Sequence, residues 1–240
     1  DRLGKLERAA KLDADDIAAD PQRSLTFPSD ADIVQAFSET GLVGSLYEEF
    51  EPRIEQVAMA EAVRKAFSSS ENLLVEAGTG VGKSMAYLVP AALTARANNI
   101  AVGVATKTNT LLDQLVYHEL PALEKALRLA DPDRPSLTYA PLKGFSHYPC
   151  LRKIGHIVEE GAQTKLFGNK EQTQAPSLAA LLSFIEQTEY DDMDSLKIDY
   201  RVLPRRLITT TANDCLRRKC PYFGTSCFVH GSRRRAEAAD

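Results

Sequence analysis

The sequence predicts an α/β fold, in which part of a parallel β-sheet with a phosphate-binding loop is followed by a mainly helical insertion around a metal site. Short apolar runs alternate with helical patterns between residues 54 and 119, and this alternation is typical of βαβ units. A glycine-rich loop lies directly after the first apolar run, and all four cysteines follow residue 149, where the alternation has ended.

The composition is that of a globular protein, with 44% hydrophobic and 26% charged residues among 240. The net charge of −4 is unevenly distributed, because residues 1–51 hold 12 acidic and five basic side chains, whereas residues 201–235 hold nine basic ones and a single acid. A basic block is usually a solvated face, but its overlap with the cysteines makes a phosphate-contacting surface an equal alternative. No apolar run reaches the roughly 18 residues of a membrane span, so we expect no membrane association.

Three regions are expected along the chain. Residues 1–30 are interpreted as a linker or the tail of a preceding domain, residues 31–140 as the first part of an ATP-binding domain, and residues 141–240 as a four-cysteine domain. Proline breakers precede the first boundary, and the alternating pattern stops near the second.

A first helix is expected over residues 31–38, where Ser29 and Asp30 offer a cap. A second is expected over residues 54–67, where apolar residues recur at three-to-four spacing. Residues 73–75 form a short apolar run that predicts a buried strand. A helix over residues 84–97 should follow the glycine-rich loop, and Pro90 should kink it or loosen one of its turns.

A second strand is expected over residues 100–106, and a helix over residues 109–119. In the last region, residues 161–176 are interpreted as a polar loop, and residues 179–187 as its one clear helix.

The glycine-rich loop predicts a phosphate site. Its residues are Ala77-Gly78-Thr79-Gly80-Val81-Gly82-Lys83-Ser84. Backbone N–H groups at a helix N-terminus point at phosphate oxygens, and glycines let the backbone approach them. We expect Lys83 to contact the β- and γ-phosphates of ATP and Ser84 to ligate Mg²⁺, and we interpret both as catalytic.

The cysteines predict a metal site. They are Cys150, Cys215, Cys220 and Cys227, the last three within 13 residues. Two disulfides would need an oxidising compartment, and isolated buried thiols do not explain such a cluster among arginines. Structural zinc usually takes closely spaced cysteine pairs, so the uneven spacing favours a 4Fe–4S cluster but leaves zinc open.

Together these motifs resemble those of the DinG branch of the XPD-like superfamily 2 helicases. The resemblance extends over the phosphate loop, the segment Val104 to Leu115, the run Lys143-Gly144-Phe145-Ser146-His147-Tyr148-Pro149-Cys150, and Asp214 to Tyr222 with Cys227-Phe228. Alanine at position 77, where the general phosphate-loop pattern has glycine, is common in such helicases.

The resemblance implies a RecA-like ATP-binding domain interrupted by a 4Fe–4S domain. It implies that Arg53 and Gln56 lie at the nucleotide, where a glutamine reads adenine. It also implies that single-stranded or forked DNA contacts Thr106, Lys107 and Thr108 and the exposed residues Arg217, Arg218 and Lys219. The implied protein is a cytoplasmic, monomeric ATP-dependent DNA helicase of DNA repair, moving 5′ to 3′.

Two other functions remain open from the residues alone. One is a P-loop kinase or transferase with a zinc-stabilised lid, and the other is a non-catalytic nucleic-acid-binding fragment. No Asp-Glu-x-His box, which would orient Mg²⁺ and water, occurs in the sequence. We therefore expect this chain by itself to bind nucleotide weakly and not to hydrolyse it.

Overall fold

The computed structural model describes residues 24–163 and 170–239. The contacts of the described residues divide the chain into two compact units, one up to Ile100 and the other from Ala101 onward. The linker or tail predicted for residues 1–30 lies mostly outside the described residues, and the domain boundaries stay predictions.

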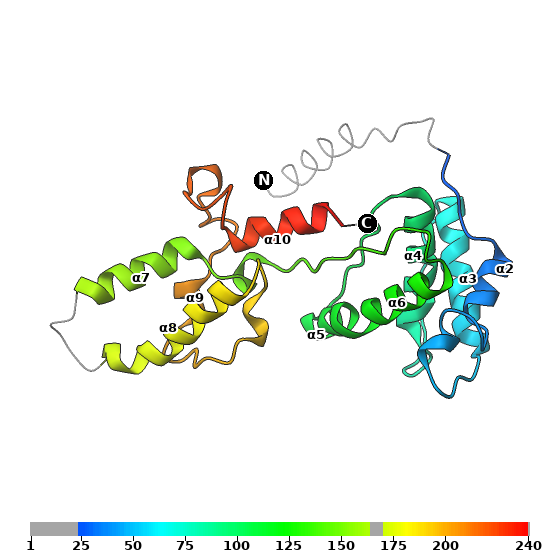
Figure 1. Cartoon of the computed structure of the whole chain (residues 1–240), viewed down its shortest axis with the longest axis horizontal. Coiled ribbons are helices and arrows are strands. Elements are labelled where there is room, and N and C mark those ends of the chain that lie inside the picture. The colour runs from blue at the N-terminus through cyan, green and yellow to red at the C-terminus, as the bar shows by residue number, and fades with distance from the viewer. Residues whose placement is uncertain (1–23, 164–169, 240) are drawn as a thin grey trace. The chain divides into compact units, whose positions relative to one another are not determined.

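The first unit is a small helical assembly (Figure 1). It contains α2 (Asp30–Ala36), the 3₁₀ turn η1 (Gly44–Leu46), α3 (Ile54–Ser69) and α4 (Lys83–Asn98). Helix α3 packs along α4, and α2 contacts both. The three helices expected in this region are confirmed, and Pro90 is buried within α4.

A capping box fixes the start of α2, because Ser29 accepts a hydrogen bond from the backbone of Asp32 while the Asp32 carboxylate accepts from the backbone of Ser29. Apolar side chains of the three helices then form the core, including Ile33, Ala60 and Val89, each of them fully buried.

The predicted parallel sheet is wrong for this structure, since the described residues contain no β-strand. The runs 73–75 and 100–106 are present but pair with no neighbouring strand. A strand is stable only when its backbone groups are paired and its apolar face is covered. Neither condition is met, and Leu74 is 98% exposed. The fold class seen here is therefore helical rather than α/β.

The second unit is also helical, and its elements are α5 (Asn109–Gln114), the π-helical turn η2 (Leu115–Glu119), α6 (Leu120–Ala130), η3 (Phe145–His147), α7 (Leu151–Gln163), α8 (Lys170–Gln187), η4 (Met193–Ser195), α9 (Arg205–Ile208), η5 (Arg217–Lys219) and α10 (Phe228–Glu237).

Some helices of this unit depart from the sequence-based expectation. The helix expected over residues 109–119 is present, but it ends in a π-helical turn that leads directly into α6. Helix α7 and the first two turns of α8 occupy much of the polar stretch interpreted as a loop. A helix with many polar residues is easily mistaken for a loop, because its narrow apolar stripe is recognised only when the element that it packs against is known.

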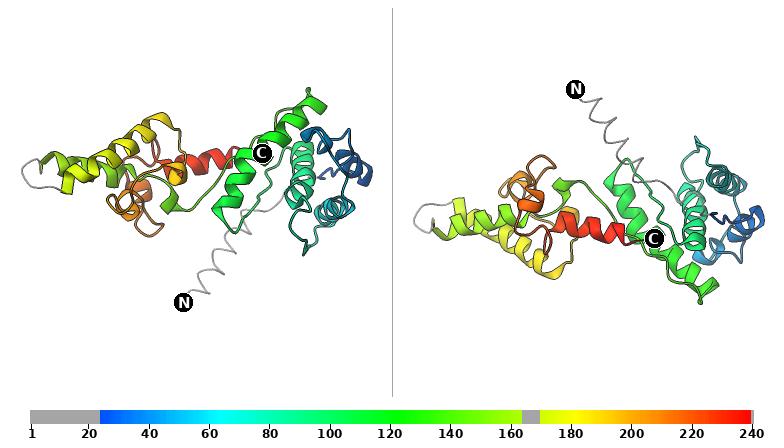
Figure 2. Two further views of the ribbon diagram at one scale, coloured as in Figure 1. Left: turned by 90° about the horizontal axis from the view of Figure 1, so that it is seen from below. Right: turned by 90° about the horizontal axis from the view of Figure 1, so that it is seen from above.

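Two apolar clusters build the scaffold of this unit. The larger consists of Ile154, Leu181, Met193, Leu203 and Ile208, and the smaller of Tyr148, Phe228 and Val229. Helices α7 and α8 both contribute to the larger cluster, and they lie next to each other in all views (Figure 2). Partly buried Phe184 and Ile185 pack against both clusters and join them.

Candidate functional site

The phosphate loop lies at the start of α4 and is open to solvent. Gly80 and Gly82 have φ angles of 84° and 77°, in the left-handed region that glycine adopts without strain. Gly82 is the N-cap of α4, with no side-chain cap. The backbone N–H groups of the first turn therefore face outward, as an anion site at a helix N-terminus requires.

Lys83 folds back onto this loop. Its ammonium donates to the carbonyl oxygen of Ala77 at 3.1 Å and to that of Gly78. Ser84, Thr79 and Val81 lie beside it along the same loop and first turn. A phosphate would offer the ammonium a full negative charge in place of these two carbonyls.

Two side chains at the start of α3 donate hydrogen bonds to the backbone of the loop. Gln56 is only 5% exposed, and its Nε2 donates to the carbonyl oxygen of Gly82 at 2.8 Å. The guanidinium of Arg53 donates to the carbonyl oxygen of Gly80. A Cβ atom at Gly82 would lie 2.2 Å from Gln56 Nε2. The structure therefore places Arg53 and Gln56 at the phosphate loop, where both bind backbone carbonyls.

The segment predicted to contact DNA lies at the start of α5. The Thr108 hydroxyl caps this helix by accepting from the Leu111 N–H at 3.3 Å, and the Thr106 hydroxyl donates to the Thr108 carbonyl at 3.0 Å. Both threonine hydroxyls thus make hydrogen bonds within this segment. The charged side chain of Lys107 is exposed to solvent.

The four cysteines line a single pocket of the second unit. Cys150, Cys215, Cys220 and Cys227 surround a space of about 430 Å³ that includes its open mouth. All four are free thiols and partly buried. The distant Cys150 therefore joins the other three, although 64 residues separate it from Cys215 in sequence.

The backbone of the unit positions these thiols. The Cys150 N–H donates to the carbonyl oxygen of Ile208 at 2.7 Å, which ties the start of α7 to the end of α9. Cys227 is the N-cap of α10. Helix α10 approaches the chain at Tyr190 closely, since a Cβ at the buried Gly231 would lie 2.1 Å from that ring.

His230 also lines the pocket. Its Nε2 lies 3.8 Å from the Cys215 sulfur, and its ring lies 4.4 Å from that of Phe223. Burial lowers the pKa of His230, and Arg233, Arg217 and Arg234 lower it further. The imidazole is therefore neutral at pH 7 and has one N–H to donate. Sequence reasoning missed this residue, although it follows Cys227 by one helical turn.

Burial raises the pKa of the Cys227 thiol, and the nearby Cys215 and Cys220 raise it further, whereas backbone N–H groups at His230 and Val229 lower it.

The thiols do not converge on one point. In the described part of the chain no three Cys, His, Asp or Glu side chains are placed to hold a single ion. A 4Fe–4S cluster takes one thiolate at each of four irons, so its ligands surround a volume rather than a point.

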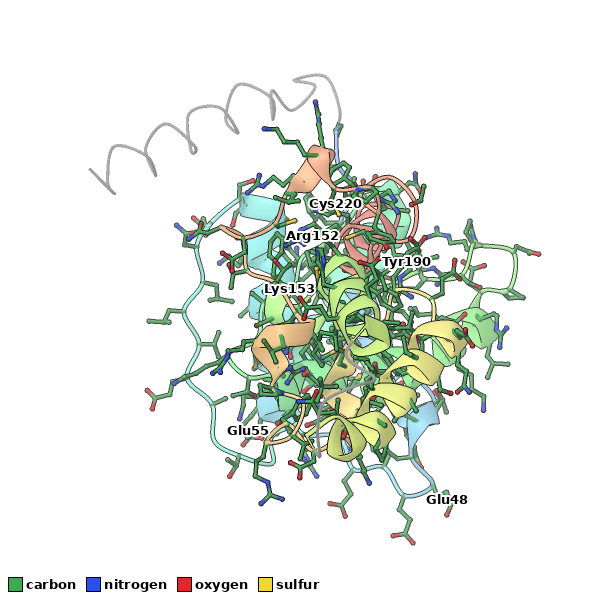
Figure 3. All side chains as sticks on the ribbon, turned by 90° about the vertical axis from the view of Figure 1, so that its left-hand side faces the viewer. Glu48, Glu55, Arg152, Lys153, Tyr190 and Cys220 are labelled. Atoms are coloured by element: carbon green, nitrogen blue, oxygen red, sulfur yellow. The ribbon has the colours of Figure 1, made fainter. Side chains whose placement is uncertain are left out.

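Basic residues rim the pocket. Arg152 and Arg217 line it together with the cysteines, and Cys220 and Arg152 are labelled in Figure 3. Arg217, Arg218 and Lys219 are exposed. Arg217 has a φ of 48°, and its backbone N–H donates to the Cys215 sulfur at 3.4 Å. No hydrogen bond or ion pair joins this loop to Thr106–Thr108 among the described residues.

Comparison with known proteins identifies the family. The chain is 32% identical over 209 residues to the ATP-dependent DNA helicase YoaA of Haemophilus influenzae, covering 87% of the chain and 30% of that protein. It is 38% identical over 193 residues to the ATP-dependent helicase DinG of Mycobacterium tuberculosis, covering 77% and 29% respectively. The chain is DinG-like.

The ATP-dependent DNA helicase DinG of Escherichia coli is 30% identical over 203 residues, which cover 79% of the DinG-like chain and 27% of that protein. The chain thus spans less than a third of the length of these relatives. No protein-family profile matches it. No helix among the described residues is both long and apolar enough to cross a membrane.

A buried ion-pair cluster is the main feature of the DinG-like chain that the motifs did not reveal. Lys143 opens the run that ends at Cys150, but its side chain is 1% exposed and lies among three carboxylates. Its partners Asp113, Asp192 and Asp194 come from distant parts of the sequence. Only a signal for contact between those segments could have shown that this lysine is buried.

Proposed function

We propose that this chain is the nucleotide- and DNA-binding part of an ATP-dependent DNA helicase that holds a 4Fe–4S cluster. The names of its relatives support the helicase. The observation that favours the cluster is the gathering of four free thiols, separated by up to 77 positions, around one pocket. A kinase or transferase gives no reason for such a pocket rimmed by arginines.

In this proposal ATP binds at the start of α4. Residues Ala77 to Gly82 offer backbone N–H groups to the phosphates, and the Lys83 ammonium leaves the carbonyls of Ala77 and Gly78 for the phosphate charge. The Ser84 hydroxyl supplies an oxygen ligand to Mg²⁺. Gln56 and Arg53 hold the loop backbone through the Gly82 and Gly80 carbonyls, so the amide nitrogen of Gln56 that would read adenine is already used by the loop.

The four pocket cysteines would hold the cluster. Their uneven spacing favours an iron–sulfur cluster, since structural zinc usually takes closely spaced cysteine pairs. A bound cluster would supply a covalent cross-link between the Cys150 segment and the Cys215–Cys227 loop, together with one-electron chemistry. The Arg217 backbone and the His230 ring would donate to the Cys215 sulfur, and Arg152 would offset negative charge at the pocket.

Single-stranded or forked DNA is the proposed polymer substrate. Lys107 with Thr106 and Thr108 forms one set of contacts, and Arg217, Arg218 and Lys219 form the other. Phosphate contacts of this kind give sequence-tolerant binding that weakens with salt. Movement from 5′ to 3′, action as a monomer and a cytoplasmic location follow from the family resemblance alone.

The proposal is tested on anaerobically purified protein. We expect a yellow-brown chain with the broad visible absorption of a cluster, about four iron and four acid-labile sulfide atoms per chain, and salt-dependent affinity for oligo(dT). A colourless protein containing one zinc ion would contradict the cluster and support a zinc-stabilised fold. Absence of oligo(dT) binding at low salt would contradict the DNA-binding role.

A further inference from the structure

Lys143 is the centre of the buried ion-pair cluster. Its ammonium lies 3.0 Å from both Asp192 Oδ1 and Asp194 Oδ2, with hydrogen-bond geometry, and 2.8 Å from Asp113 Oδ1. The contact with Asp113 is an ion pair whose angles fall outside those of a hydrogen bond. Asp113 makes the shortest of the three contacts and is the most exposed of the three carboxylates, at 37% against 7% and 19%.

The carboxylates stabilise the buried charge. Burial by itself would lower the pKa of Lys143, but the interactions with Asp113, Asp192 and Asp194 outweigh this effect and hold the pKa above its ordinary value. A buried ammonium without partners would cost several kcal/mol. The lysine and its carboxylates thus require each other, and their positions are coupled.

The partners of Lys143 come from two segments, and both connect to residues that the proposed function assigns to DNA or to the cluster. Asp113 lies on α5, immediately after Thr106–Thr108. Asp192 and Asp194 lie at η4, and Asp194 also pairs with Arg205 on α9 and with His147 Nδ1 at 2.9 Å. Helix α9 in turn ends at Ile208, whose carbonyl holds Cys150.

We propose that Lys143, through Asp113, is a positioning residue that fixes the Thr106–Thr108 contacts at a set spacing from the basic loop Arg217–Lys219, so that both bind one DNA strand at once. The inference rests on the proposed DNA binding. It adds that the two sets of contacts act as one site because the ion pair joins their supports.

Two linked contact sets bind a long strand more tightly than either alone, because the second set meets the strand at high effective concentration. This gain exists only for strands long enough to reach both sets. Loosening the link lowers the effective concentration without changing either set. The affinity for short strands therefore reports the contacts, and the extra affinity for long strands reports the link.

The test measures the affinity of the whole chain for oligo(dT) from about 4 to about 24 nucleotides, a range that brackets single binding sites. Asp113→Asn removes the charge of the most exposed partner and leaves Lys143 paired with Asp192 and Asp194. Asp131→Asn is the matched control, because Asp131 is similarly exposed and pairs with Arg134 at 3.1 Å outside this cluster. Visible absorption and circular dichroism check that each variant keeps its cluster and fold.

We expect Asp113→Asn to bind short strands as the unaltered chain does and long strands about tenfold more weakly, a typical coupling within one ion-pair network. Asp131→Asn should match the unaltered chain at every length. Equal long-strand affinity in the two variants would overturn the inference, as would a loss in Asp113→Asn that is the same at all lengths. Absence of any gain with length in the unaltered chain would overturn it too, while short-strand binding would still support the proposed function.

Discussion

The phosphate loop takes its binding groups from eight consecutive residues, whereas the cysteine pocket gathers four thiols from a stretch that runs from Cys150 to Cys227. The loop is shaped by two glycines in left-handed backbone and by two side chains that hold its carbonyls. The pocket is shaped by two apolar clusters and a buried ion-pair network.

This difference has a consequence for how each site fails. A local loop loses function when one of its own groups is removed, but its surroundings keep their fold. A pocket assembled from distant segments depends on the packing that brings them together, so a change at a ligand or at its scaffold affects the whole second unit.

The largest expected effect is the loss of the cluster in Cys220→Ser. An iron left without its thiolate is open to solvent and labile, so we expect visible absorption and iron content to fall to near zero. Arg218→Ala, in the loop just before Cys220, serves as the control, because it should keep the cluster and lose only DNA affinity. A Cys220→Ser protein with unchanged colour and iron would show that the ligand set is wrong.

Lys83→Ala should disable the other site and leave the pocket intact. Charge-assisted hydrogen bonds contribute about 1.5–3 kcal/mol, so we expect ATP to bind about 10- to 100-fold more weakly, measured with a fluorescent analogue. The cluster absorption and oligo(dT) affinity should not change. Lys125→Ala removes an exposed lysine elsewhere and should alter neither; an equal loss in both variants would mean that Lys83 acts only through net charge.

The same comparison explains what could be predicted from the sequence. The phosphate loop and the helix after it follow from contiguous residues, because glycine backbone freedom and helix N-termini are local properties. The cysteines could be identified as a set by composition and spacing. Their meeting around one pocket, and the part that His230 has in it, depend on contacts such as that between Cys150 and Ile208, which no local pattern contains.

The prediction of a β-sheet was wrong for a related reason. Apolar runs at 73–75 and 100–106 satisfy the pattern of buried strands, but a strand needs partners that pattern cannot supply. The burial of Lys143 was missed for the same reason. A lysine is expected at the surface, and only the three neighbouring carboxylates explain why this one is buried. In both cases the missing information is tertiary contact.

The stability of the second unit should depend on pH, because its buried ion-pair cluster depends on ionised side chains. Burial by itself would raise the pKa of Asp194, but hydrogen bonds from His147, Arg205 and Lys143 outweigh this and lower it below its ordinary value. Its contribution to stability is therefore complete above the unfolded-state pKa of about 3.9 and is lost as pH falls toward the folded-state value. The contribution of Lys143, whose pKa is raised, persists at neutral pH and is lost only at strongly alkaline pH.

Asp194→Asn should lower the free energy of unfolding by about 2 kcal/mol at pH 7, the size expected for charged hydrogen bonds in a partly buried site. Urea unfolding of both proteins between pH 7 and pH 2 should show this difference shrinking below about pH 4. Asp199→Asn removes a carboxylate from the exposed pair with Arg201 and should have little effect. A difference between Asp194→Asn and the unaltered chain that is independent of pH would contradict the role assigned to the charge.

The smallest expected effect is at Gln56, and it separates two uses of this side chain. If Gln56 acts by holding the Gly82 carbonyl, Gln56→Ala should weaken ATP, GTP and inorganic triphosphate alike by about threefold, the loss of one neutral hydrogen bond. If instead it reads adenine, ATP alone should weaken and the preference for ATP over GTP should vanish. The observed contact favours the first result, because the amide nitrogen already donates to the loop and the residue is almost fully buried. Gln35→Ala, at an exposed position on α2, should leave all three affinities unchanged, so that any loss at Gln56 can be assigned to the loop.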